Sequence, residues 1–363
     1  MDQKILSLQM EVSGCVGACA HCWASGHPYP PMMLGHIERI LSEAAGFAQS
    51  EGMKFEPYPM HDVLTHPDAL KIMQLFDAHC HPLFEPVTTS GPVLGQRTDW
   101  EEILSGLKQL GATDFWFTFH GLNDIHDRAV NHRGAFAETV TAIQRGKSAG
   151  FGCGGNVYVT TANLHQVSQM IEFCHSVGLD GFSIEVACYH LSPRLRIYEA
   201  IRPKLDQLIP YADLIAKESG FWKEAWRNLD KCTEAHYVNQ ALTRQESEDV
   251  RWSYFDRNRI NLVCRNNMDL HTGYAGLYGP FHGNLGSDDV RLIFEKAVKA
   301  GAWPQEKLVF PDDQIPAVSE LASRWGNPKG QKIHMTAASM RLRWLDQALA
   351  REGGRRKQIP TRH

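Results

Sequence analysis

The segment Cys15-Val-Gly-Ala-Cys19-Ala-His-Cys22 places three cysteines close together near the start of a chain of 363 residues. Three thiolates with this spacing can hold three corners of a [4Fe-4S] cube and leave one iron without a protein ligand. Such an iron can bind a further cofactor, which a cluster held by four cysteines and used only for electron transfer does not offer. The spacing therefore predicts a cluster with one open iron.

A zinc site and disulfide bonds are the alternatives to a cluster at these cysteines. A zinc ion could use Cys19 and Cys22 with His21 or His27, but zinc motifs usually come as two paired half-sites, and no second Cys-x2-Cys occurs. Disulfides fit poorly because the nine cysteines are scattered and odd in number. The opening Met-Asp-Gln-Lys also lacks the basic start and apolar core of a secretion signal. We expect a reducing, cytoplasmic environment.

The composition is that of a soluble globular enzyme with one large domain or two coupled domains. Hydrophobic residues make up 43% of the chain, charged residues 21%, and the formal net charge is −4. No apolar run approaches the roughly 20 residues that cross a bilayer, which argues against a membrane-spanning role. The mild acidity argues against general nucleic-acid binding, which usually needs a basic face.

Short β-like runs alternate with amphipathic helical patterns over the first half of the chain, and this alternation predicts a parallel α/β architecture. The expected strands are Ile5–Val12, Phe55–Pro59, Pro86–Ser90, Asp114–His120, Gly155–Thr161 and Gly181–Val186. The expected helices are Ile37–Ser50, Pro67–His79, Trp100–Leu110, Ala135–Ala149 and Leu164–Val177. Six such units predict a partial (βα)6 barrel of the TIM type.

Ser13 and Gly14 end the first strand, so the cysteines lie on a loop at its carboxyl end. In this arrangement the chain resembles the radical S-adenosylmethionine (radical SAM) superfamily over roughly residues 5 to 190. The resemblance implies a partial barrel with its site at the carboxyl ends of the strands. It also implies a [4Fe-4S] cluster on Cys15, Cys19 and Cys22 that cleaves S-adenosylmethionine (SAM) reductively. The resulting 5′-deoxyadenosyl radical abstracts hydrogen from a substrate, and an external donor such as flavodoxin or ferredoxin supplies the electron.

After the second strand the family has a Gly-Gly-Glu-Pro-like stretch that contacts the amino group of SAM, and here the chain departs from it. Met60-His61-Asp62 stands at this position. A carboxylate accepts hydrogen bonds from an ammonium group, so the resemblance implies that Asp62, beside His61, takes this contact. The alternative is that both are only turn and helix-start residues.

Further matches to the family follow along the chain. Thr89-Ser90-Gly91 follows the third strand, and His120-Gly121, His126-Asp127 and Arg133-Gly134 follow the fourth. We expect His126 and Asp127 to fix a turn rather than act in catalysis. The resemblance implies that the following residues face SAM or the substrate, with barrel filling as the alternative: Thr89, Ser90, His120, Asn156, Tyr158, Ser183 and Glu185.

The expected domains are the barrel at residues 1–200, an extension at 201–302 that covers the site, and a helical segment with a basic tail at 303–363. The extension resembles a SPASM/twitch domain, with a strand at Ile260–Cys264 and a helix at Asp289–Ala300. Only Cys232 and Cys264 lie beyond residue 200, so we expect one cluster and a lid that covers the substrate.

The sequence leaves the substrate open, and a small polar molecule such as a sugar, aminoglycoside or nucleoside is the first expectation. Epimerisation needs a thiol that returns hydrogen, for which Cys264 is preferred over Cys232 and Cys188, although each can equally be a buried structural cysteine. Dehydrogenation needs no such thiol. The alternatives are a peptide-modifying maturase and, in another class, a non-catalytic iron–sulfur or zinc module.

Overall fold

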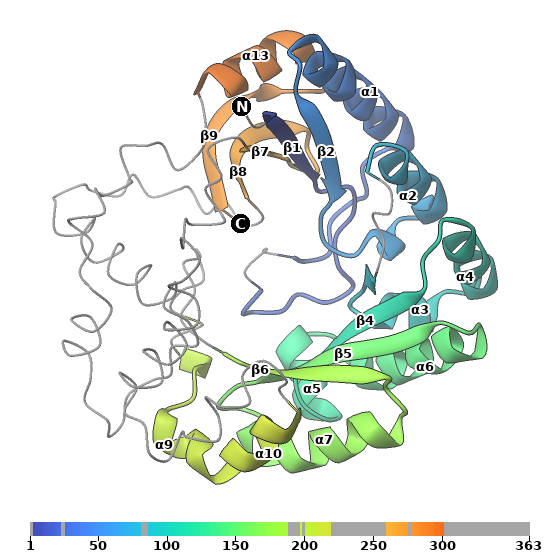
Figure 1. Cartoon of the computed structure of the whole chain (residues 1–363), viewed down its shortest axis with the longest axis vertical. Coiled ribbons are helices and arrows are strands. Elements are labelled where there is room, and N and C mark those ends of the chain that lie inside the picture. The colour runs from blue at the N-terminus through green and yellow to red at the C-terminus, as the bar shows by residue number, and fades with distance from the viewer. Residues whose placement is uncertain are drawn as a thin grey trace, which may run out of the picture. The chain divides into compact units, whose positions relative to one another are not determined.

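The computed structural model describes residues 3–22, 26–80, 86–187, 197, 200–218, 259–274 and 277–300. All six strands expected from the sequence are present. The strands are β1 (Ile5–Met10), β2 (Lys54–Pro59), β3 (Val87–Thr88), β4 (Asp114–Phe119), β5 (Gly152–Val159) and β6 (Gly181–Val186). The helices among them are α1 (Leu34–Ser50), α2 (Ala69–Asp77), α3 (Pro92–Gln96), α4 (Trp100–Gln109), α5 (Asp124–Val130), α6 (Ala135–Ser148) and α7 (Val167–Ser176). The α/β fold with parallel strands is confirmed (Figure 1).

Strand pairing divides the barrel wall into two sheets. One sheet has the order β3-β4-β5-β6, and β3, β4 and β5 pair in parallel. The other has the order β2-β1-β7-β8-β9, where β7 is Arg259–Cys264, β8 is Asp269–Tyr274 and β9 is Leu277–Asn284. The carboxyl ends of the parallel strands within each sheet therefore lie along one edge, where loops can build a site.

Strand β7 is the main addition to the predicted topology. It pairs in parallel with β1 on the side away from β2, with Met10 opposite Cys264. β8 and β9 then continue the sheet in antiparallel pairing, and helix α13 (Val290–Ala300) packs against α1 (Figure 1). The strand expected at Ile260–Cys264 and the helix expected at Asp289–Ala300 are both confirmed, but the strand extends the barrel sheet itself.

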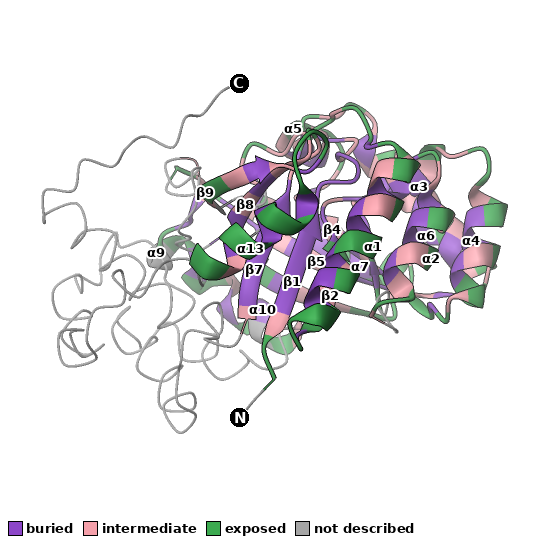
Figure 2. Cartoon of the chain, turned by 90° about the horizontal axis from the view of Figure 1, so that it is seen from above, coloured by how far each residue is buried: buried purple, intermediate pink, exposed green. Residues whose placement is uncertain are grey.

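The core lies between the sheets and the helices that cover them. Leu6, Leu8 and Met10 alternate along β1 and belong to one buried apolar cluster with Phe115 and Phe117 of β4. The helices turn buried residues inward and exposed residues outward (Figure 2). Every second residue of β1 packs in this apolar layer, so the alternate residues of β1 face the barrel interior.

The chain divides into two compact units, and all site residues discussed below belong to the first. In the second unit the described residues include two short helices, α9 (Leu205–Leu208) and α10 (Ala212–Glu218). Cys188, Cys232 and the expected helical segment at 303–363 lie outside the described residues. Within the part of the chain that the structure describes, no helix is long and apolar enough to cross a membrane.

Candidate functional site

The three cysteines lie on the loop that follows β1, as the sequence predicts. The amide of Cys22 donates to the Cys19 carbonyl at 3.0 Å, and the amide of Gly26 donates to Cys22 Sγ at 3.2 Å. Burial raises the pKa of the Cys15 thiol, and the negative charges of Asp62, Cys22 and Cys19 raise it further. The thiols are therefore close enough to repel one another as thiolates, which is the arrangement that a cationic iron core neutralises.

The donor set fits an iron–sulfur cluster better than a single ion. No group of three His, Cys, Asp or Glu side chains among the described residues is arranged to hold one metal ion. A cube places each thiolate on a different iron, so it does not need that compact set. The geometry therefore gives no support to the zinc alternative.

Two contacts with neighbouring elements hold the cluster loop. The amide of Ala18 donates to the carbonyl of Val130, at the end of α5, at 2.8 Å. A Cβ atom on Gly17 would lie 2.6 Å from that same carbonyl oxygen, so only glycine permits this approach. At the base of the loop, Thr65 Oγ1 donates to the carbonyl of Gly14 at 2.6 Å.

Gly26 closes the loop over the thiols. A Cβ atom here would lie 3.0 Å from Cys15 Sγ and 3.5 Å from Cys22 Sγ. Gly26→Ala is therefore expected to lower the iron content of the reconstituted protein by about half, because the methyl group competes with the thiolates for space. Gly35→Ala is the control, since a Cβ on Gly35 meets nothing within 4 Å. Equal iron in both variants, measured by colorimetric assay, would refute this role of Gly26.

Asp62 joins the loop after β2 to the loop after β3. Its Oδ2 accepts from Thr89 Oγ1 at 2.9 Å, from the Ser90 amide at 2.7 Å and from Ser90 Oγ at 2.5 Å. Its Oδ1 accepts from the amide of Leu64 at 3.3 Å. Burial raises the pKa of Asp62, and these hydrogen bonds oppose the rise. The structure brings three of the predicted residues, Asp62, Thr89 and Ser90, together as one hydrogen-bonded cluster.

His120 and Tyr158, predicted from separate strands, meet at the cluster loop. The ring of His21, which stands between Cys19 and Cys22, lies 4.6 Å from the His120 ring and is stacked on Tyr158 at 5.5 Å. Burial lowers the pKa of His120 well below its usual value, so this imidazole is neutral. The cluster loop therefore packs against the ends of β4 and β5.

His126 and Asp127 fix the turn after β4, as expected from the sequence. Asp127 accepts from the amides of Gly134 at 2.6 Å and Phe136 at 2.9 Å, which holds the start of α6. His126 Nδ1 accepts from the His120 amide at 3.2 Å, and its Nε2 is buried without a hydrogen-bond partner among the described residues. Both residues are structural in this arrangement.

Burial lowers the pKa of His126 to about 4. The unfolded chain takes up this proton near pH 6.5, and the folded chain only near pH 4, so stability falls as the pH drops through this window. Between about pH 7.5 and 5.5 we expect His126 to account for a loss of about 1 kcal/mol. His126→Gln should lose correspondingly less stability over that range in denaturant titrations. Identical losses in the two proteins would contradict the buried neutral state of His126.

Polar residues continue this face across β5 and β6. Asn156 and Tyr158 alternate on one face of β5, and Ser183 Oγ donates to Asn156 Oδ1 at 2.6 Å. Glu185, two residues beyond Ser183, is exposed, and partial desolvation raises its pKa. Asn156, Tyr158, Ser183 and Glu185 therefore share the face on which His21 lies.

Cys264 has a different environment from the one expected of a hydrogen donor at the site. It is fully buried and belongs to the apolar cluster that contains Leu8 and Met10. Its thiol contacts the carbonyl of Arg265 at 3.6 Å, and burial raises its pKa. Alternation along the strands places this thiol on the helix side of the sheet, away from the barrel interior. Its surroundings are those of the alternative, a buried structural cysteine.

Two charged residues were not predicted from the sequence, Glu11 and Arg265. Glu11 follows β1 and continues the interior-facing series of Ser7 and Gln9, all three of them buried. A carboxylate in such a series indicates a buried charge. The alternation is visible in the sequence, so Glu11 could have been predicted from it. Arg265 follows β7, and its role depends on the pairing of β7 with β1, which the sequence does not show.

Comparison with known proteins agrees with this geometry. The model of the radical SAM superfamily matches residues 12–174. The structure of anSMEcpe with bound AdoMet and Cp18Cys peptide has a TM-score of 0.51 and 14% identity, covering 96% of this chain and 97% of that chain. SuiB of Streptococcus suis bound to S-adenosylmethionine has a TM-score of 0.46 and 14% identity, covering 80% of this chain and 66% of that chain. The comparison with curated proteins gave no match.

The matched segment contains Cys15, Cys19 and Cys22 and strands β2 to β5. Its thiols fit the cluster, and the likeness to anSMEcpe supports the fold. Residues 12–174 therefore form a radical SAM domain, and the cofactors that this domain implies are a [4Fe-4S] cluster and SAM.

Proposed function

We propose that this radical SAM enzyme abstracts hydrogen from a peptide substrate. The observation that carries the proposal is the likeness to anSMEcpe over nearly the full length of both chains, in a structure that holds both AdoMet and a peptide. A substrate of this kind is favoured over the sugar, aminoglycoside or nucleoside first expected from the sequence.

The residues of the site have separable tasks in this proposal. Cys15, Cys19 and Cys22 would hold the cluster, and SAM bound there would supply a 5′-deoxyadenosyl radical on reduction. An external electron donor is required. His120 is neutral and buried beside the cluster loop, so it orders the His21 and Tyr158 rings without adding charge.

The face of β5 and β6 suits a substrate that carries many hydrogen-bonding groups. Asn156, Ser183 and Glu185 present amide, hydroxyl and carboxyl groups in a row from two adjacent strands. A peptide backbone offers a donor and an acceptor at nearly every residue, so it can pair with such a row. We propose that these three side chains orient the peptide.

Protease sensitivity of the substrate tests the proposal. The reconstituted, reduced protein is incubated with SAM and an extract of the source cells, before and after the extract is digested with a broad-specificity protease that is then removed. We expect the extract to stimulate 5′-deoxyadenosine formation above the substrate-free rate, and digestion to remove the stimulation. A stimulating component that survives digestion and passes an ultrafiltration membrane would contradict a peptide substrate and favour a small polar molecule. The Cys19→Ala protein, incubated with the undigested and with the digested extract, gives the background level of 5′-deoxyadenosine.

A further inference from the structure

Phe281 of β9 has an exposed ring that packing in the core does not explain. Among the Phe, Tyr and Trp side chains that the structure describes it is the most exposed, at 58%. A single exposed apolar side chain is ordinary on the outer surface of a protein. The face of the sheet that carries Phe281 therefore decides whether the exposed ring can serve a ligand.

Phe281 ends a row of directly opposed residues that crosses four strands. Gln9 of β1 pairs with Val263 of β7, Val263 with His271 of β8, and His271 with Phe281 of β9. Directly opposed residues of neighbouring strands share one face of a sheet. Gln9 belongs to the interior-facing series of β1, so the whole row lies on that face. The exposed ring of Phe281 therefore faces the barrel interior.

His271 forms a corner with Phe281. The centroids of the two rings are 5.5 Å apart and their planes are tilted by 53°. His271 Nδ1 lies 3.3 Å from the carbonyl oxygen of Gly279, which can only accept, so this nitrogen carries the proton. Burial lowers the pKa of His271, so the ring is neutral near pH 7. The charges of Arg265 and Glu11 also act on it, which places the corner on the Glu11 side of the sheet.

Irregular pairing on both sides of His271 sets the position of Phe281. The register of β8 and β9 shifts between Leu270 and His271 and again between His271 and Gly273. Such shifts give up regular pairing, and they recur beside binding sites because they re-aim a side chain. Pro280, just before Phe281, is exposed and offers no amide to a further strand. This part of β9 therefore suits contact through the ring rather than addition of a strand.

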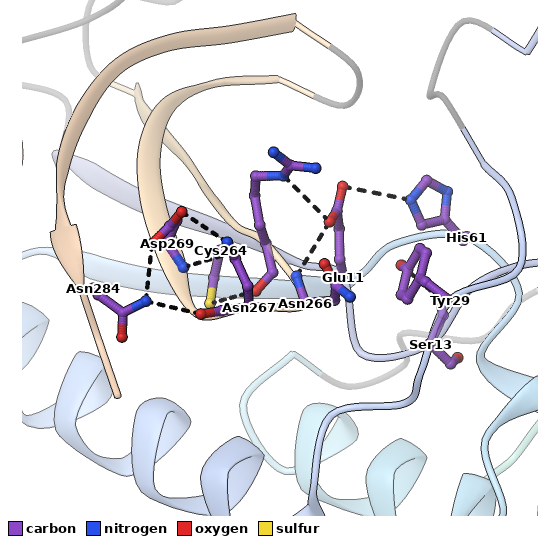
Figure 3. A network of polar contacts seen from close by, with 10 residues as sticks. Glu11, Ser13, Tyr29, His61, Cys264, Asn266, Asn267, Asp269 and Asn284 are labelled. Atoms are coloured by element: carbon purple, nitrogen blue, oxygen red, sulfur yellow. Dashed lines mark hydrogen bonds and ion pairs between the residues drawn. The ribbon is translucent and has the colours of Figure 1, made fainter. Parts of the chain in front are cut away.

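A polar network fixes β8 and β9 to the strand end that carries the cluster loop. Asn284 Nδ2 donates to Asp269 Oδ1 and to the carbonyl of Asn267, both at 2.8 Å (Figure 3). Glu11, which follows β1, accepts from the amide of Asn266 at 3.2 Å through its Oε2. The aromatic corner therefore stands on strands that are tied to the end of β1.

We propose that His271 and Phe281 form a binding site for an aromatic side chain of the substrate peptide. A third ring packs on the exposed Phe281 ring and against the neutral imidazole. Aromatic rings gain from tilted and offset contacts beyond the apolar area that they bury, so this corner favours a ring over an aliphatic side chain. The inference rests on the proposed peptide substrate and names the residue class that the enzyme selects in it.

Peptide selection by the anaerobic, cluster-loaded protein tests the site without turnover. The immobilised protein is incubated with SAM and a pool of short random peptides, without reductant, and the retained peptides are sequenced by mass spectrometry. We expect the wild type to enrich peptides with Phe, Tyr or Trp over those with Leu or Ile. Phe281→Ala should reduce this enrichment about threefold to tenfold. Leu292→Ala, which removes a 48% exposed side chain from α13, is the control and should select as the wild type does.

Phe281→Leu separates the ring from its apolar area. Leucine keeps much of the apolar surface, so this variant should retain aliphatic peptides as the wild type does and lose the preference for rings. Iron content and circular dichroism check folding. If Phe281→Ala fails to take up iron, Phe281→Leu decides the question by the same preference.

The outcomes separate this inference from the peptide substrate itself. An undiminished preference for aromatic peptides in the Phe281 variants would overturn the aromatic site, as would a wild type that retains peptides without any such preference. A wild type that retains no peptide at all would overturn the peptide substrate and this site together.

Discussion

Cys19→Ala is expected to abolish the [4Fe-4S] cluster and with it all reductive cleavage of SAM. Two thiolates from one loop cannot hold three corners of a cube, and no further cysteine in the described residues lies on this loop. Iron content should fall from about four per chain to near zero, and 5′-deoxyadenosine to the level of the iron-free protein. Anaerobic reconstitution followed by iron assay and chromatography measures both.

The matched control for this prediction is Cys80→Ala. Cys80 follows α2 and lies near Lys54 at the start of β2, the end of the strand opposite the cluster loop. Its replacement should leave iron content and SAM cleavage unchanged. Full cluster content in Cys19→Ala would contradict the assignment, as would complete loss of the cluster in Cys80→Ala.

Asp62→Ala is expected to cause the largest loss of stability among single changes at the site. The substitution removes the acceptor of Thr89 Oγ1, Ser90 Oγ and the Ser90 amide at a position that is only 2% exposed. Buried donors left without an acceptor cost about 1–3 kcal/mol each, so we expect a total loss of about 3–5 kcal/mol. Denaturant unfolding measures it. Asp68→Ala, at a half-buried position that pairs with Lys71, should cost about 0.5 kcal/mol or less.

Asp62→Asn separates a structural role of this residue from the cofactor role expected from the sequence. The amide keeps the shape and one acceptor oxygen, so the protein should fold with an intermediate loss of stability. If Asp62 only joins the two loops, the folded Asn variant binds SAM as tightly as the wild type. If the affinity for SAM instead falls about tenfold or more, Asp62 contacts the amino group of SAM, as the sequence suggests.

Local patterns in the sequence were enough to predict the barrel elements and the cluster loop. The six strands and the spacing of Cys15, Cys19 and Cys22 depend on residues that are neighbours along the chain. The pairing of β7 with β1 joins residues about 250 positions apart, and no local pattern reports it. For that reason the sequence predicted the strand at Ile260–Cys264 but not its pairing with β1.

The same limit applies to the charged residues of the site. Glu11 stood in a recognisable series of interior polar residues, but its neighbours His61 and Arg265 come from loops after β2 and β7. Cys264 shows the opposite case, because its position at a strand end suggested a hydrogen donor at the site, and the register with Met10 buries it on the helix side. The pairing and register of a strand decide which of its side chains face the site.

The formation of 5′-deoxyadenosine from SAM tests the central claim most directly. The protein is reconstituted anaerobically, reduced with dithionite and incubated with SAM, and the products are separated by liquid chromatography with mass detection. We predict 5′-deoxyadenosine and methionine in equal amounts from the wild type, and neither from Cys15→Ala, Cys19→Ala or Cys22→Ala. A wild-type protein that binds about four irons but makes no 5′-deoxyadenosine with dithionite or with a flavodoxin system would contradict the radical mechanism.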